Sequence, residues 1–311
     1  MLIILLISLL RRKTMNDQAK NLRKIMEFKS VNQEEITVVN NKAKVISISS
    51  GKGGVGKTNF AINFAITLKR LGYEVAIIDA DIGLSNIEIL AGVNMNFTIS
   101  DIIFSNKDIF EIMSIGPEGI KIISGGSGLK ELSLLKDDNF PKLLKEIEKL
   151  QSSTDYIIID TGAGISKAVT DFIMTSDETI IICTPDPTSL MDSYTLIKSI
   201  FYTGFPGPIN IVCNLVNSKS EGTEIFNKLY NTTNKFLQRD INYLGYIEKS
   251  DLVNNAVRNQ IPFTISNPNN SISRKINVMA MNFLGTKSVK DENTKKSFSK
   301  RILDIFLGRG E

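Results

Sequence analysis

The sequence contains no histidine and only two cysteines among its 311 residues. Without histidine, the chain lacks the usual general acid and base near neutral pH and the commonest protein ligand of transition metals. Cys183 and Cys213 lie in separate apolar runs and do not form a Cys-x-x-Cys pair. This arrangement disfavours an iron–sulfur or zinc site and favours buried free thiols in a reducing cytosol. Any chemistry must therefore depend on aspartate, glutamate, lysine and backbone groups.

The chain also lacks strong net charge and a long apolar segment near its start. The net charge of +4 is too small to indicate a nucleic-acid partner. The apolar run over residues 1–10 is too short to span a bilayer, and its basic residues follow it, unlike those of a signal peptide. We therefore expect translation to start at Met15 and residues 1–14 to be an upstream extension; a short membrane anchor is the alternative.

Apolar, β-branched runs of strand length alternate with helical patterns from residue 44 onward. Such runs are typical of strands that are buried on both faces, as in a parallel sheet covered by helices. The pattern predicts strands over residues 45–48, 75–78, 120–123, 156–159, 179–182 and 209–213. It predicts helices over residues 58–71, 140–150, 167–175, 188–202, 225–237 and 271–284. The predicted fold class is α/β, with a doubly wound, mostly parallel sheet flanked by helices.

One domain and two tails are expected. Residues 41–285 hold the alternating pattern and contain no internal repeat, which excludes pumps with duplicated halves. Residues 15–40 are polar and helix-prone, and residues 286–296 are charged and have the composition of a flexible linker. Residues 297–311 become apolar again.

The segment from Gly51 to Thr58 has the sequence of a P-loop between a predicted strand and a predicted helix. Glycines allow backbone N–H groups to converge on phosphate oxygens, and the start of the helix adds partial positive charge. Lys57 is expected to contact the β- and γ-phosphates, and the Thr58 hydroxyl to bind Mg²⁺. The predicted nucleotide-binding residues of this loop are Gly53, Gly54, Val55, Gly56, Lys57, Thr58 and Asn59. A glycine-rich turn without a ligand is the alternative, and it does not explain the Lys57–Thr58 pair.

Three aspartates follow the ends of two predicted strands. Asp79 and Asp81 lie two residues apart, so alternation directs both to one side at the carboxyl edge of the sheet, where ligands bind. Asp160 ends another strand and precedes Gly162 and Gly164. A water-mediated Mg²⁺ contact suits Asp160, and the glycines allow the loop to reorganise when the γ-phosphate leaves. Since no side-chain base with a raised pKa is evident, hydrolysis is expected to be slow.

A second lysine, Lys52, stands near the start of the loop, and Lys52 to Thr58 reads KGGVGKT. This segment resembles the deviant Walker A motif of the MinD/ParA class of ATPases. The resemblance implies that the nucleotide is ATP and that Lys52 reaches across a face-to-face homodimer to the partner's nucleotide. It also implies that Asp81 polarises the attacking water and that Asp79 supports the Mg²⁺ shell or the closing loop. A solvated surface lysine and an Asp79 that only caps a turn are the alternatives.

The same resemblance implies roles for further residues. Asn214 follows the strand over residues 209–213 and takes the position of an asparagine that reads the adenine edge. The alternative is a residue of a turn at the end of the strand. Pro185 to Pro187 is expected to form part of the wall around the base. The implied catalytic set is Lys52, Lys57 and Asp81, and the implied Mg²⁺ set is Thr58, Asp79 and Asp160.

Segments outside the P-loop resemble the FlhG subfamily, also called YlxH or FleN. Residues 17–23 read DQAKNLR and match the DQAxxLR element of that subfamily, and the loops at residues 160–166 and 184–190 resemble its flagellar versions. Residues 245–247 and 257–263 continue the pattern. The resemblance implies that Gln18, Leu22 and Arg23 engage the GTPase FlhF, with Gln18 nearest its chemistry. An amphipathic helix that packs on its own core is the alternative.

The pattern of residues 297–311 predicts an amphipathic helix. One broad face holds Phe298, Ile302, Leu303, Ile305 and Phe306, and the other holds Lys300, Arg301 and Asp304. It resembles the C-terminal membrane-targeting helix of MinD and FlhG, which implies weak binding by one helix and stronger binding by the two helices of an ATP-bound dimer. The alternative is a helix that packs back on the domain, and the two arrangements can alternate.

Together these patterns predict an ATP-binding, slowly hydrolysing dimerisation switch at the inner face of the cytoplasmic membrane. Through FlhF it would regulate flagellar number or placement, with flagellar C-ring components as further candidate partners. A partition-type ATPase that binds DNA non-specifically is a second hypothesis, but it needs a basic dimer edge and no C-terminal amphipathic helix. A MinD-like division-site ATPase with a MinC-like partner is a third. Nucleic acid is the disfavoured partner.

Overall fold

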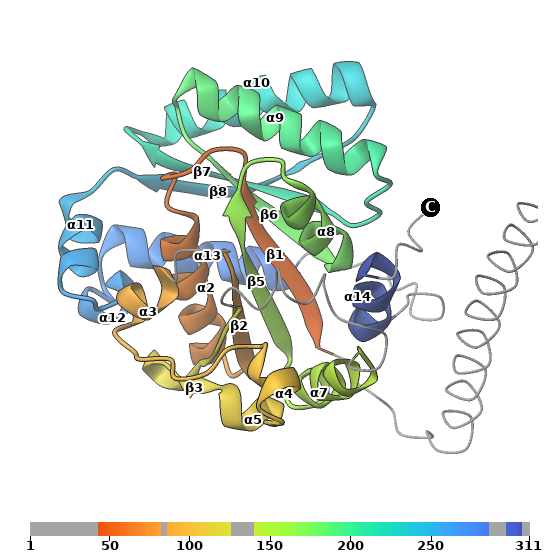
Figure 1. Ribbon diagram of the computed structural model, residues 1–311. Coiled ribbons are helices and arrows are strands. Elements are labelled where there is room, and N and C mark those ends of the chain that lie inside the picture. Colours follow the sequence, from red (N-terminus) through yellow and green to blue (C-terminus); the bar gives the residue numbers. More distant parts are fainter. Residues whose placement is uncertain (1–42, 82–85, 126–139, 286–296, 307–311) are drawn as a thin grey trace, which may run out of the picture. The chain divides into compact units, whose positions relative to one another are not determined.

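The computed structural model describes residues 43–81, 86–125, 140–285 and 297–306 (Figure 1). Contacts divide the chain into two units, Met1–Asn40 and Asn41–Glu311, and every described residue belongs to the second. Among the described residues, no helix combines the length and the apolar character needed to cross a membrane.

An eight-stranded sheet in the order β3-β4-β2-β5-β1-β6-β7-β8 forms the centre of the second unit. The strands are β1 (Lys44–Ser50), β2 (Val75–Ala80), β3 (Ser114–Ile115), β4 (Lys121–Ser124), β5 (Tyr156–Ala163), β6 (Glu178–Cys183), β7 (Ile209–Val216) and β8 (Asn242–Glu248). Neighbouring strands are parallel except for β3 and β4. The predicted fold class and all six predicted strands are therefore confirmed. The two edge strands were not predicted, because β3 has only two residues and β8 is interrupted by Gly245 and lacks a continuous apolar run.

Helices cover both faces of the sheet (Figure 1). The described helices are α2 (Lys57–Arg70), α3 (Asn86–Ala91), α4 (Asp101–Phe104), α5 (Ile109–Ile112), α7 (Phe140–Ser152), α8 (Lys167–Thr175), α9 (Pro187–Tyr202), α10 (Lys219–Leu237), α11 (Asp251–Arg258), α12 (Phe263–Ser266), α13 (Ser271–Gly285) and α14 (Phe298–Phe306). A short 3-10 helix, η1, spans Pro117–Gly119. All six predicted helices are present, although α10 begins six residues earlier than the predicted residue 225, behind an N-cap at Ser218. The short helices α3, α4, α5, α11 and α12 were not predicted.

Alternation along the buried strands assigns their side chains to two layers. Ile46, Ile77 and Ile158 pack into the cluster formed with α2 and α13. Val45 and Ile157, one residue away on the same strands, belong to the cluster on the opposite face with α7 and α14. A third cluster joins β6 and β7 to α8, α9 and α10. Because Asp160 lies two residues after Ile158, its side chain faces the α2 layer, where the P-loop ends.

The first part of α14 packs back on the domain. Phe298 and Ile302 are 2% and 7% exposed and share the hydrophobic cluster of α7. The Ser299 hydroxyl donates to Glu148 over 3.0 Å, and Arg301 pairs with Asp177 at 2.8 Å. This is the arrangement that the sequence left open as the alternative to a free apolar face. The side chains of Leu303, Ile305 and Phe306 lie outside the described residues, and membrane binding by this helix stays a prediction.

Candidate nucleotide-binding site

The P-loop connects β1 to α2 at the carboxyl edge of the sheet. Gly56 is the N-cap of α2, with a φ of 87°, and no side chain caps the helix. The first turn of α2 also contains no acidic residue. Backbone N–H groups at this helix start are therefore left for an anion, and the helix dipole favours one there. The loop has the geometry expected of a phosphate cradle.

Asn214, two residues before the end of β7, is fixed against this loop. Its Nδ2 donates a hydrogen bond of 2.7 Å to the carbonyl oxygen of Val55. A Cβ on Gly56 would lie 2.5 Å from the same Nδ2, and the φ of 87° is one that side chains rarely adopt, so the position favours glycine. The structure therefore shows Asn214 as a support of the loop, and its role in reading adenine stays a prediction. Asn59 points along α2, where its Oδ1 accepts from Asn63 over 2.9 Å.

Lys57 and Asp160 form a buried ion pair at the centre of the site. The Lys57 Nζ lies 2.7 Å from Asp160 Oδ1 and 3.5 Å from the Thr58 hydroxyl. The two side chains are 7% and 1% exposed. Burial raises the pKa of Asp160, and the Lys57 ammonium opposes that rise. The second oxygen, Asp160 Oδ2, is buried and has no hydrogen-bond partner among the described residues.

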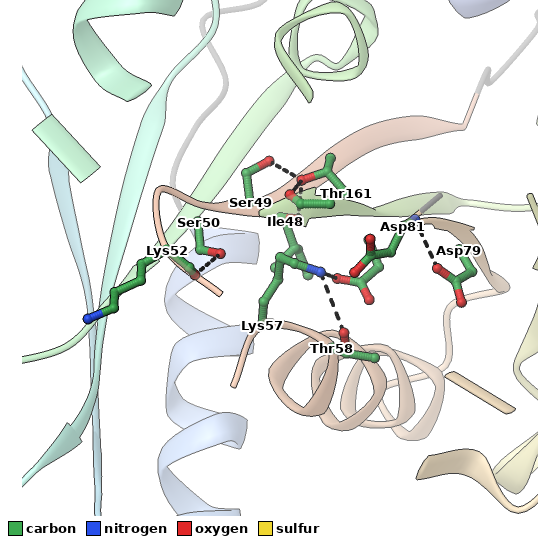
Figure 2. Close-up of polar contacts among 11 residues, drawn as sticks. Ile48, Ser49, Ser50, Lys52, Lys57, Thr58, Asp79, Asp81 and Thr161 are labelled. Atoms are coloured by element: carbon green, nitrogen blue, oxygen red, sulfur yellow. Dashed lines mark hydrogen bonds and ion pairs between the residues drawn. The ribbon is translucent and has the colours of Figure 1, made fainter. Parts of the chain in front are cut away.

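Asp79 and Asp81 lie beside this pair, as Figure 2 shows. Asp79 is paired in register with Asp160 on the neighbouring strand β5, and its Oδ1 accepts from the Asp81 N–H over 3.1 Å. Burial raises the pKa of Asp79 to about 7, and the nearby Asp160 carboxylate contributes to the rise. Asp81 Oδ1 lies 3.4 Å from the place where Gly162 would carry a Cβ. The three predicted carboxylates are thus brought together, with Asp81 against the loop that follows β5.

The residues present fit a magnesium ion. A buried carboxylate oxygen without a partner at Asp160 and a hydroxyl at Thr58 are ligands that Mg²⁺ accepts alongside water and phosphate oxygens. Within the described ranges, no group of three or more His, Cys, Asp or Glu side chains could hold a metal by itself.

Lys52 occupies a different position from Lys57. Figure 2 shows its side chain pointing away from the Lys57 group. Its Nζ lies 2.7 Å from Asp186 Oδ2 and 2.6 Å from the Thr188 hydroxyl, and the lysine side chain is 39% exposed. The hydrogen bond from Lys52 lowers the pKa of Asp186 to about 2. Neither contact was predicted, although an Asp-Pro-Thr sequence is a recognisable helix start, and Asp186 is the N-cap of α9.

Two further segments contact the P-loop. A Cβ on Gly51 would overlap the backbone of Asp192 in α9, so this glycine permits the close approach of that helix. The Gly164 N–H donates to the Ser50 carbonyl over 2.9 Å. These contacts place α9 and the residue after β5 directly against the start of the P-loop. The predicted partner-binding residues Gln18, Leu22 and Arg23 lie outside the described residues.

Comparison with protein families finds one matching model. The ParA family, described as a NUBPL iron-transfer P-loop NTPase, matches residues 41–284. Among curated proteins, the flagellum site-determining protein YlxH of Helicobacter pylori is 33% identical over 94% of this chain and 100% of its own length. The antiactivator FleN of Pseudomonas aeruginosa is 32% identical over 70% of this chain and 78% of its own.

Solved structures with the same fold include cell-division ATPases and plasmid-partition proteins. The MinC:MinD complex of Aquifex aeolicus has a TM-score of 0.63 at 21% identity and covers 82% of this chain and 100% of that one. MinD of Pyrococcus horikoshii with Mg-ADP also has a TM-score of 0.63, at 19% identity, and covers 82% of this chain and 100% of its own. At these identities the likeness shows the fold alone.

Proposed function

Because the chain belongs to the ParA family of P-loop ATPases, in the FleN/YlxH (FlhG) subfamily, we propose that it is an ATP-driven dimerisation switch that regulates flagellar number or placement. The flagellar assignment is supported by the flagellum site-determining protein YlxH, which aligns with this chain over its own whole length. The solved MinD structures share only the fold with this chain, so they do not favour a division role.

The observation that carries the proposal is the separation of the two lysines. Lys57 is buried beside Asp160, where the phosphates of the chain's own nucleotide would lie. Lys52 points away from that group and is held at the surface by Asp186 and Thr188. A lysine in this position suits a contact with the nucleotide of a second copy better than one with its own. In the proposed switch, ATP joins two chains, and Lys52 exchanges Asp186 for the partner's nucleotide.

Hydrolysis then depends on few side chains. The N–H groups of the loop and Lys57 hold the phosphates, and Asp81 orients the attacking water. Mg²⁺, held by Thr58 and Asp160 with Asp79 in support, would supply charge neutralisation on the β- and γ-phosphates. When ATP is bound, Lys57 must turn from Asp160 toward phosphate. Loss of the γ-phosphate releases the loop around Gly162, which packs under Asp81.

The C-terminal helix gives the switch a second output. Its first turns cannot be both buried on the domain and inserted into a lipid surface, so the docked and membrane-bound arrangements exclude each other. Burial of Phe298 and Ile302 stabilises the docked form by roughly 1.5–3 kcal/mol per side chain. Undocking therefore costs free energy, which membrane binding must offset. A dimer carries two such helices, and binding through both raises avidity by about 10²–10⁴. We propose that ATP-bound dimers expose both helices at the inner face of the cytoplasmic membrane.

The proposed partner is the GTPase FlhF, engaged through Gln18, Leu22 and Arg23. The support is the DQAKNLR sequence at residues 17–23. A pull-down of FlhF with the full chain tests this directly: binding is expected for the wild type and is lost in Gln18→Ala/Arg23→Ala. Equal recovery with both proteins refutes the role of these residues, and no recovery with the wild type refutes the assignment and favours the partition or division alternatives.

Dimerisation has its own test. Analytical ultracentrifugation with ATP and Mg²⁺ is expected to show a dimer for the wild type and a monomer for Lys52→Ala. Nucleotide binding by the Lys52→Ala monomer should be retained, since Lys52 lies outside its own phosphate cradle. A Lys52→Ala protein that still dimerises with ATP contradicts the proposed role of this lysine.

A further inference from the structure

One carboxylate, Asp177, contacts both the first residues of β1 and the C-terminal helix α14. Asp177 directly precedes β6 and lies two residues after the end of α8. Its Oδ2 accepts the backbone N–H of Val45 over 2.8 Å. Its Oδ1 accepts from Arg301 Nη1, also over 2.8 Å. Arg301 donates in addition to the Ser176 carbonyl over 3.3 Å.

The contact to Val45 extends the sheet by one step. Regular pairing of β1 with β6 begins at Ile46 opposite Glu178, one residue farther along each strand. At the preceding position the Asp177 N–H donates to the Val45 carbonyl over 2.8 Å, and its side chain accepts from the Val45 N–H. The backbone and side chain of Asp177 thus complete both hydrogen bonds of Val45. On the other side of β1, the Lys44 N–H donates to the Asp155 carbonyl over 2.9 Å.

Apolar packing joins the same two segments. Ala43 and Val45 at the root of β1 belong to one buried cluster with Phe298 and Ile302 of α14. Ala43 is 4% exposed and Val45 is fully buried. In the sequence, these residues follow the N-terminal segment that is proposed to bind the GTPase. The first described residues of the chain, 43–45, and the C-terminal helix therefore share both a polar contact and a hydrophobic contact.

We propose that docking of α14 and ordering of the β1 root are coupled through Asp177. Arg301 positions the carboxylate and compensates its charge, and the positioned carboxylate holds the Val45 N–H. When α14 leaves, Asp177 loses its cation, and the Ala43–Val45 cluster loses two large apolar side chains. By linkage, an event that loosens the root of β1 also weakens docking of α14 by the same factor. One consequence of the inference rests on the proposed function: when a membrane binds α14, the root of β1 loosens, and this root follows the proposed GTPase-binding segment in the sequence.

The first test is amide hydrogen exchange of the full chain without nucleotide or lipid. Arg301→Ala is expected to raise exchange at Val45 roughly tenfold relative to the amides of β2, which report global unfolding. Lys300→Ala is the matched control, because it removes a positive charge from the exposed neighbour on the same helix. No preferential change at Val45 in Arg301→Ala, or an equal change in Lys300→Ala, overturns the proposal.

A second comparison asks whether Arg301 acts through Asp177. In an Asp177→Asn background, Arg301→Ala is expected to change exchange at Val45 by less than about twofold, since a shared contact makes the two effects non-additive. A full tenfold effect in that background would mean that Arg301 acts by another route. Removal of residues 298–311 eliminates α14 and leaves Asp177 itself unmutated. That truncation should therefore reproduce the Arg301→Ala effect. A truncated protein with wild-type exchange at Val45 also refutes the coupling.

A final arm separates this inference from the proposed function. Vesicles of anionic phospholipid are added with ATP, and bound protein is collected before exchange. Faster exchange at Val45 in bound protein than in protein with ATP and no vesicles supports the coupling. Equal exchange in the two samples contradicts it. Failure to bind vesicles counts against the proposed membrane role and leaves the decision on the coupling to the variants above.

Discussion

Replacement of the P-loop lysine Lys57 by methionine should destabilise the protein even when no nucleotide is present. Lys57 Nζ lies 2.7 Å from Asp160 Oδ1, with both side chains buried. At an effective dielectric constant of about 20, that separation corresponds to an attraction of about 6 kcal/mol, part of which is offset by desolvation. Removal of one partner from such a pair costs about 3–5 kcal/mol, because the other charge stays buried without compensation. We expect Lys57→Met to lose stability in that range at pH 8.

Urea denaturation without nucleotide or magnesium measures this loss. Lys52→Met is the matched control, because Lys52 is 39% exposed and its pair with Asp186 contributes about 0–1 kcal/mol at most. The double variant Lys57→Met/Asp160→Asn should recover most of the loss. The defect should also shrink at low pH, because burial raises the pKa of Asp160 and a protonated Asp160 needs no cation. Equal stabilities for Lys57→Met and Lys52→Met refute the reasoning.

Three further predictions concern the same site and the docked helix. Because the pKa of Asp79 is raised to about 7, its ionisation destabilises the folded protein as the pH rises from about 4 through 7. In urea denaturation, Asp79→Asn should therefore be a few kcal/mol more stable than the wild type at pH 8 and equally stable at pH 4. A difference that does not depend on pH contradicts this. Gly56→Ala should weaken ATP binding at least tenfold in calorimetry, because its Cβ would meet Asn214 at 2.5 Å and its φ is 87°; unchanged affinity rejects that account of the loop. Phe298→Ala should cost about 3–5 kcal/mol, whereas Phe236→Ala, at a side chain that is 64% exposed, should cost under about 1 kcal/mol; equal losses on thermal unfolding would show that α14 is not docked in solution.

The parallel sheet and its long helices could be predicted because burial on both faces leaves a continuous apolar run that contrasts with its surroundings. The two edge strands could not be predicted. β3 has two residues, and β8 carries polar and glycine positions, since an edge strand is covered less completely than a central one. The short helices that were not predicted hold four to eight residues, too few for a helical period to stand out.

Within the site, the residues of the P-loop and the strand-end aspartates were predictable because each follows its strand directly in sequence. The partners of Lys52 were not, since Asp186 lies 134 residues away and meets it only in the folded sheet. The docking of α14 shows a second limit. An amphipathic pattern predicts that Phe298 and Ile302 share a face, but a protein core and a lipid surface are both apolar, so the pattern alone does not distinguish them.

Vesicle co-sedimentation of the full chain and of a chain that ends at Lys296 tests the central claim most directly. The account predicts that the full chain sediments with anionic vesicles in ATP and stays in solution in ADP, whereas the shortened chain stays in solution in both. The shortened chain should still dimerise with ATP, which shows that its ATPase domain is intact. Equal, ATP-dependent sedimentation of the two proteins would contradict the claim that α14 connects the nucleotide state to the membrane.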